Sequence, residues 1–180
     1  MVERQLCRRV VAIFGVIAIS TIAAGAAGRA NPDRVSRTGP SQLEPFDALV
    51  GGAWHLDGSY QVFEWGVGRE LVRAKSYAIA GADTSLVSEG MWFWHPGEDA
   101  IQGLVAAVGM PISLFEYVTR VEGDRFSHQL TAYGDMGGAY TEEWDLTDAN
   151  HYQWTLYDGP APAGSPMMSG TFERVSWPDE

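Results

Sequence analysis

The residues in this sequence best suited to chemistry are its histidines and the acidic side chains near them. The chain has four histidines, His55, His95, His128 and His151, and none stands in an H-E-x-x-H motif or a Cys/His cluster. Those spacings are the ones that make a metal site persuasive. The sequence therefore predicts no metal site.

His128 and Glu142 are the most suggestive pair. The strand register described below places both side chains on one inner face, diagonal to each other on neighbouring strands. A histidine with an orienting carboxylate in an apolar interior could act as a general base. The alternatives are a hydrogen-bonded pair within the wall and a pair that contacts a ligand. Because no G-x-S-x-G elbow or other nucleophile accompanies the pair, we expect no enzyme activity.

Aromatic side chains dominate the same predicted face. Flat rings with polar handles suit planar or amphipathic ligands, although they could instead fill a small barrel completely. The sequence leaves both alternatives open. The predicted ligand-binding residues, with no catalytic ones among them, are Tyr117, His128, Tyr140, Glu142, Trp144, Tyr152 and Trp154.

The elements that must position these residues are short β-strands. Segments rich in Trp, Tyr, Phe, Val and Thr alternate with Gly, Pro, Asp and Asn, as in a closed antiparallel barrel. We predict an all-β fold, a single up-and-down antiparallel barrel of about ten strands. The expected strands are 52–57, 60–65, 70–79, 85–95, 100–107, 112–122, 125–134, 139–147, 151–157 and 167–175.

Three hairpin turns carry the strand register across the second half of the chain. They place Tyr117, the predicted site residues and Phe126 on one apolar face, and Glu116 and Glu143 on the opposite face, toward water. In the first half, the run Trp92-Phe93-Trp94 is apolar on both faces, so the inner and outer faces are not assigned there. The predicted cross-strand pairs are Glu122 with Arg125, Tyr133 with Ala139, and Thr147 with His151.

The N-terminus is typical of an export signal. Arginines precede an apolar run from Val10 to Ala24, and small residues follow. We expect a secretory signal peptide over 1–26, with a retained anchor helix as the alternative, a disordered linker over 27–41 and the barrel domain over 42–176. Cys7 lies inside the signal, so the mature chain would have no thiol and no disulfide.

A short helix is expected just before the first strand. Ser41-Gln42-Leu43-Glu44 matches a capping box, and Leu43, Phe46, Leu49 and Val50 are spaced to bury one face. Such a helix would plug one end of the barrel. The long connection from Asp158 to Pro166 is either a plain loop or a lid over the open end.

The charge of the chain excludes several partners. Its formal net charge is −11, and removal of the signal would make it more negative. Such a surface repels nucleic acid and anionic membranes. We therefore expect an exported, monomeric protein, periplasmic or extracellular, whose partner is a small hydrophobic or amphipathic molecule.

The tract Gly52-Ala53-Trp54 resembles the G-x-W opening of the calycin superfamily, which includes lipocalins and fatty-acid-binding proteins. In that superfamily a basic residue on the last strand packs across the tryptophan. The resemblance implies that Arg174 lies over Trp54 and closes the barrel, and a guanidinium over an indole face is a favourable contact.

Longer tracts look like a bacterial family of uncharacterised calycin-like barrels. The tracts are 60–65, 88–96 and 168–174, and the resemblance covers nearly all of 43–175. It implies the fold, and no reaction comes with it.

Nitrobindins are similar in having ten strands and a G-x-W opening, and they bind haem b through a histidine near the C-terminus. Residues 167–180 contain no histidine here, so His128 or His151 would have to serve. We thus expect no cofactor, with haem b as the alternative. The expected function is binding of an apolar or amphipathic ligand in the lumen, and the other alternative is an interaction module with a filled core.

Overall fold

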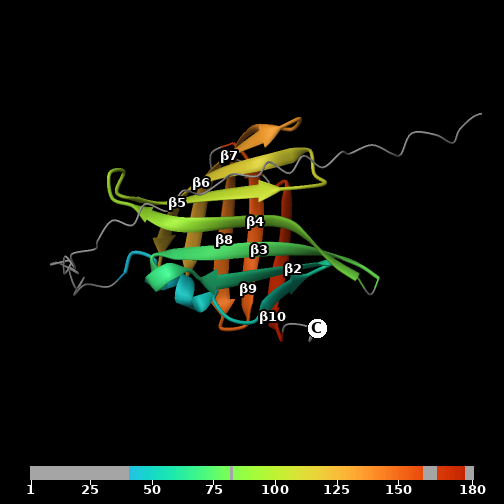
Figure 1. The fold of residues 1–180 in the computed structure, drawn as a ribbon, viewed down its shortest axis with the longest axis horizontal. Helices are drawn as coiled ribbons and strands as arrows, with labels where there is room; N and C mark the ends of the chain where they lie inside the picture. Colours follow the sequence, from blue (N-terminus) through green and yellow to red (C-terminus); the bar gives the residue numbers. More distant parts are fainter. Residues whose placement is uncertain (1–40, 82, 160–165, 177–180) are drawn as a thin grey trace, which may run out of the picture. The chain divides into compact units, whose positions relative to one another are not determined.

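The computed structural model describes residues 41–81, 83–159 and 166–176. These residues form a closed antiparallel barrel of ten strands in which each strand pairs with its neighbours in sequence and β1 pairs with β10 (Figure 1). The predicted all-β, up-and-down fold is therefore confirmed. The strands are β1 (Ala53–Leu56), β2 (Ser59–Trp65), β3 (Leu71–Ala80), β4 (Asp83–His95), β5 (Ala100–Ala107), β6 (Ile112–Glu122), β7 (Arg125–Gly134), β8 (Gly138–Asp148), β9 (His151–Asp158) and β10 (Met168–Val175).

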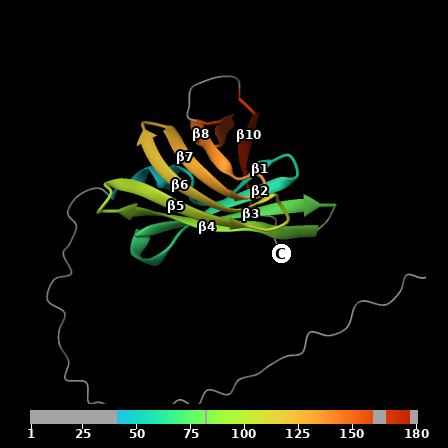
Figure 2. The ribbon, with the colours of Figure 1, turned by 90° about the horizontal axis from the view of Figure 1, so that it is seen from above.

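The barrel has two walls that cross. Strands β2 to β5 run across β8 to β10 in Figure 1, and Figure 2 shows the same walls from above. Each strand alternates side chains between the inside and the outside, so one face of every strand lines the interior. Among the described residues, no helix is long and apolar enough to cross a membrane.

A short helix packs against one end of the barrel, as predicted. It is the 3₁₀ helix η1 (Glu44–Ala48), and a second 3₁₀ turn, η2 (Val67–Arg69), joins β2 to β3. The prediction of a capping box is wrong, because the N-cap is Leu43 and has no side-chain cap hydrogen bond. The Ser41 hydroxyl instead accepts from the Leu43 backbone nitrogen at 3.2 Å. The predicted apolar face is present, with Leu43, Phe46 and Leu49 at most 1% exposed.

Arg174 and Trp54 hold this end of the barrel together. They are directly paired residues on β10 and β1, and the guanidinium carbon lies 4.3 Å from the centroid of the Trp54 ring. The Trp54 indole nitrogen donates to the Leu49 carbonyl at 2.8 Å. The contact implied by the G-x-W resemblance is thus present at the η1 end.

The register of β7 on β8 differs from the predicted one by two residues. Ala139 pairs with Thr131 and not with Tyr133, and the last pair is Ala132 with Gly138, so the loop is as long as predicted but begins one residue earlier. A two-residue shift preserves the inner and outer faces. It places His128 directly opposite Glu142, where the sequence predicted a diagonal relation.

Glu143 is a second correction. It lies on the outer face as predicted, but it is only 7% exposed, whereas Glu116 is exposed as expected. Arg125, on the neighbouring strand, forms an ion pair with Glu143 at 2.5 Å, and Tyr157 also interacts with it. These two side chains cover the carboxylate from outside. The expected signal (1–26), nearly all of the linker (27–41) and most of the Asp158–Pro166 loop lie outside the described residues.

Candidate functional site

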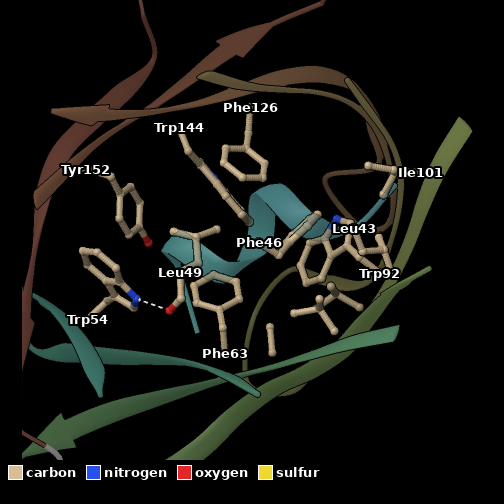
Figure 3. Close-up of a cluster of buried hydrophobic side chains, with 13 residues drawn as sticks. Leu43, Phe46, Leu49, Trp54, Phe63, Trp92, Ile101, Phe126, Trp144 and Tyr152 are labelled. Atoms are coloured by element: carbon tan, nitrogen blue, oxygen red, sulfur yellow. Dashed lines mark hydrogen bonds between the residues drawn. The ribbon is translucent and has the colours of Figure 1, made fainter. Parts of the chain in front are cut away.

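Aromatic rings fill the half of the barrel next to η1. Phe46 of η1 inserts between Trp92 and Phe126, with ring centroids 6.2 and 5.0 Å away (Figure 3). Trp144 lies 5.8 Å from Trp92 and 5.6 Å from Phe63. These rings come from both walls and meet over the helix, so this half of the interior is a packed core.

The inner wall becomes partly exposed toward the other end. Along β3, Val72 and Ala74 are at most 5% exposed, but the next inward position, Ser76, is half-buried. Along β9, Tyr152 is fully buried and Trp154 is half-buried. The exposure therefore increases from η1 toward the turn between β1 and β2. We call this part-exposed inner surface the far wall; its members include Gln61, Ser76, Ser88, Tyr117, Trp154 and Leu156.

Glu142 lies where the packed core meets the far wall. One of its carboxylate oxygens, Oε1, accepts hydrogen bonds from the indole nitrogens of Trp144 at 2.8 Å and Trp154 at 2.5 Å. The Tyr117 hydroxyl provides a further hydrogen bond to the carboxylate. Three strands, β6, β8 and β9, thus direct donors at one acid. The sequence predicted these four residues as site residues, and the structure brings them together.

Burial changes the acidity of this cluster. Removal from water raises the pKa of Glu142, and the hydrogen bonds from Trp144, Trp154 and Tyr117 oppose that rise. Burial raises the pKa of Tyr117 well above its usual value, and the neighbouring carboxylate adds to the effect. Burial thus makes the ionised form of Glu142 harder to keep, while its three donors favour that form.

His128 does not bond to Glu142 in the described part of the chain, so the predicted pair is wrong. Its Nδ1 atom shares a hydrogen bond with the Thr119 hydroxyl at 2.8 Å, and the ring packs 4.2 Å from the Trp144 ring. Burial lowers the pKa of His128 to about 3, which keeps it neutral. The two side chains are opposite on paired strands but turn to different partners. This arrangement gives no base oriented by a carboxylate.

Two buried nitrogens near His128 have no hydrogen-bond partner among the described residues. They are Nε2 of His128 and Nε1 of Trp92. Trp92 lies directly over the backbone of Gly103, where an added Cβ would come within 2.6 Å of the indole nitrogen. Only glycine leaves room for the indole at this position, so Gly103 fixes where Trp92 packs.

The hydroxyl groups of Tyr152 and Tyr140 bond to residues outside the Glu142 cluster. Tyr152 is fully buried, and its hydroxyl donates to the Gln61 side-chain oxygen at 2.6 Å. Tyr140 is half-buried near the far end, where its hydroxyl donates to the Met136 backbone oxygen at 3.0 Å. Of the seven predicted ligand-binding residues, Tyr117, Trp154 and Tyr140 are partly exposed, whereas His128, Trp144 and Tyr152 belong to the packed core.

The surroundings of His128 do not fit a haem. Its ring is enclosed by the rings of Trp92, Tyr117, Phe126 and Trp144, whose centroids are 4.2 to 6.4 Å away. A porphyrin would need the space that these rings occupy. His151 lies on the outside and forms a 3.0 Å ion pair with Asp148. No group of three or more His, Cys, Asp or Glu side chains is placed to hold a metal ion in the described ranges.

A groove of about 1020 Å³ lies at the η1 end, between η1 and the adjoining ends of β5 to β8. Its lining does not include Tyr117, Glu142 or Trp154, so it is separate from the far wall. The floor contains Ile101, Phe126 and Leu146. Acidic side chains surround it: Glu44, Asp47, Glu98, Asp99, Glu122 and Asp124.

The sequence reasoning missed the interior residues of the first half. Gln61, Phe63 and Trp92 all face inward, and each contacts a predicted residue of the second half. The Asp57-Gly58 dipeptide, a strong hairpin signal, would have carried the inward face of Trp54 to Gln61 and Phe63. No comparable signal reaches Trp92.

No protein-family model matches this chain, and no curated protein matches it. The fold and the site therefore rest on the geometry described above.

Proposed function

We propose that this chain is an exported, monomeric, calycin-like barrel that binds a small apolar or amphipathic molecule at the far wall of its lumen. The observation that carries the proposal is the position of Glu142 and its donors, Tyr117 and Trp154, at the boundary between a packed core and partly exposed inner strands. Binding sites of small molecules are commonly apolar and aromatic, with a few oriented polar groups.

The arrangement supports binding over catalysis. His128 is neutral and buried against Thr119, and Glu142 is held by neutral donors. The Thr119 hydroxyl that contacts His128 is only 2% exposed, so a substrate has no access to it. We therefore propose no reaction and no haem for this site.

A fluorescent apolar probe tests the proposal. The mature protein should bind the neutral probe N-phenyl-1-naphthylamine with one saturable site, and Trp154→Ala should weaken binding by about tenfold, because a large ring of the far wall is removed. Leu104→Ala is a matched control, since Leu104 is a large apolar side chain 43% exposed on the outside of β5. Its binding should equal that of the wild type. Equal loss in both variants, or binding only to partly unfolded protein, would contradict a site in the lumen.

A second candidate is an interaction module with a filled core. The acidic groove at the η1 end favours it, because this groove is an accessible surface separate from the far wall. Absence of probe binding, together with absence of any small molecule in native mass spectra of the purified protein, would support this alternative.

A further inference from the structure

We propose that the ligand of the far wall carries a protonated amine, which pairs with Glu142. This inference rests on the proposed function and adds the chemical class of the ligand. It follows from the charge balance around Glu142 and from the position of that carboxylate relative to the exposed part of the lumen.

Neutral donors hold the carboxylate, and none of them supplies a positive charge. Trp144 and Trp154 both donate to Oε1, and Tyr117 adds a third hydrogen bond. An ionised carboxyl group can accept about four hydrogen bonds. Glu142 therefore retains capacity for one further donor. A buried carboxylate without an opposite charge is costly to keep.

The basic side chains of the described residues lie elsewhere. Arg69, Lys75 and Arg125 form ion pairs with other acids, and Arg174 donates to backbone carbonyls at the η1 end. The two others, Arg73 and Arg120, are exposed. His128, which faces Glu142 from β7, has a pKa lowered to about 3 and stays neutral. In the described part of the chain, Glu142 thus has no counter-ion.

An amine can reach this carboxylate from the far wall. Glu142 is 9% exposed, and its donors Tyr117 and Trp154 are half-buried beside it. From there the apolar remainder of the ligand would lie along Leu156, toward the end of the barrel at the β1–β2 turn. The chain's formal net charge of −11 favours the approach of cations and disfavours anions.

Three probes with the same alkyl chain test the inference: dodecylamine, dodecanol and dodecanoate, each kept below its micelle concentration. Calorimetry and quenching of tryptophan fluorescence measure their affinities. Dodecylamine should bind about tenfold more tightly than dodecanol, because a charge-assisted hydrogen bond is stronger than a neutral one. Dodecanoate should bind most weakly, since it would bring a second anion to Glu142.

Glu142→Gln should remove the preference for the amine over the alcohol while dodecanol still binds. Glutamine keeps an oxygen that can accept from the two indoles but carries no charge. Glu116→Gln is the matched control, because it removes the same charge from the exposed outer face. It should retain the tenfold preference. Loss of the preference in both variants would overturn the inference, because the effect would then come from net charge alone.

The pH dependence gives a test that needs no variant. Dodecylamine stays protonated throughout the acidic range, and Tyr117 and Tyr152, which face Glu142 from β6 and β9, have raised pKa values and stay neutral, as does His128. The amine preference should therefore fall as pH decreases and Glu142 becomes protonated. A preference independent of pH would overturn the inference. Equal binding of all three probes would overturn it as well but leave the proposed function standing, whereas binding of none would contradict the proposed function.

Discussion

His128 is a titratable side chain enclosed in the barrel, and its burial has a consequence for stability. Histidine in an unfolded chain titrates near pH 6.5, whereas burial lowers the pKa of His128 to about 3 in the folded protein. Between these values the unfolded chain binds a proton that the folded chain does not. The contribution of His128 to the free energy of unfolding is therefore complete above about pH 6.5 and is lost as pH falls toward 3. Glu142 has the opposite effect on the pH dependence of stability. Because its pKa is raised in the folded protein, its contribution to the free energy of unfolding is lost as pH rises.

The variant His128→Gln should change this pH dependence. The difference in free energy of unfolding between the wild type and the variant should shrink as pH falls below 6, by up to about 1.4 kcal/mol per pH unit. Glutamine can still bond to Thr119, and it does not titrate. Urea unfolding at a series of pH values measures the difference. Parallel curves for the two proteins would show that His128 is protonated equally in both states.

At the scale of elements, Arg174 connects four parts of the barrel through one guanidinium group. It extends from β10 over the Trp54 ring of β1, and it donates to the carbonyls of Val50 and Gly51 at 3.2 and 2.5 Å and to that of Ala48 at the end of η1. Its Nε atom donates to Ala149 in the β8–β9 turn at 3.0 Å. These carbonyls include unpaired groups at the end of a helix, which need donors.

Arg174→Ala should destabilise the protein by about 2–4 kcal/mol, because it removes a cation–aromatic contact and leaves several carbonyls without their donor. Arg174→Lys should recover only part of this loss, since an ammonium group cannot match the planar fork of the guanidinium. Arg73→Ala, at an exposed position of β3, is the control and should change stability by less than about 0.5 kcal/mol. Urea unfolding compares the three variants. Similar losses for Arg73→Ala and Arg174→Ala would contradict this role for Arg174.

Strand existence and the inner face of the second half could be predicted, because Gly-Asp turns and alternating side chains specify both. The two-residue error between β7 and β8 arose because a loop with glycines at both ends does not fix where pairing begins. The inner face of the first half could not be derived from alternation alone. The register shifts between Ser76 and Tyr77 and between Ile112 and Leu114, where an extra residue reverses the alternation.

The sequence predicted which residues gather at the candidate site, but not which of them form hydrogen bonds with each other. Alternation placed Glu142, Trp144 and Trp154 on one face, and their proximity follows from strand pairing. The choice of partners depends on side-chain rotation, which alternation does not determine. His128 therefore turned to Thr119, and Glu142 to the indoles, where a His–Glu pair was expected.

At the scale of the whole molecule, closure of the barrel depends on a short seam. β1 and β10 pair through Ala53 with Val175, Trp54 with Arg174 and His55 with Glu173. The paired residues are far apart in sequence, so closing this seam carries a large loop-closure entropy. Closure leaves no strand edge free, and free edges promote aggregation. The seam thus covers the edges of β1 and β10 as well as completing the lumen.

A chain that ends at Pro166 should fail to form a stable monomer, because it lacks β10 and exposes the pairing edges of β1 and β9. It also loses Phe172, whose ring stacks on Tyr152 at 4.7 Å, and Arg174. Size-exclusion chromatography should show aggregated or expanded protein, and near-UV circular dichroism should show loss of the fixed aromatic core. A chain that ends at Ser176 retains all ten described strands and should match the full-length protein in both measurements. If the shorter chain eluted as a compact monomer with the near-UV spectrum of the full-length protein, closure by β10 would not be required for the fold.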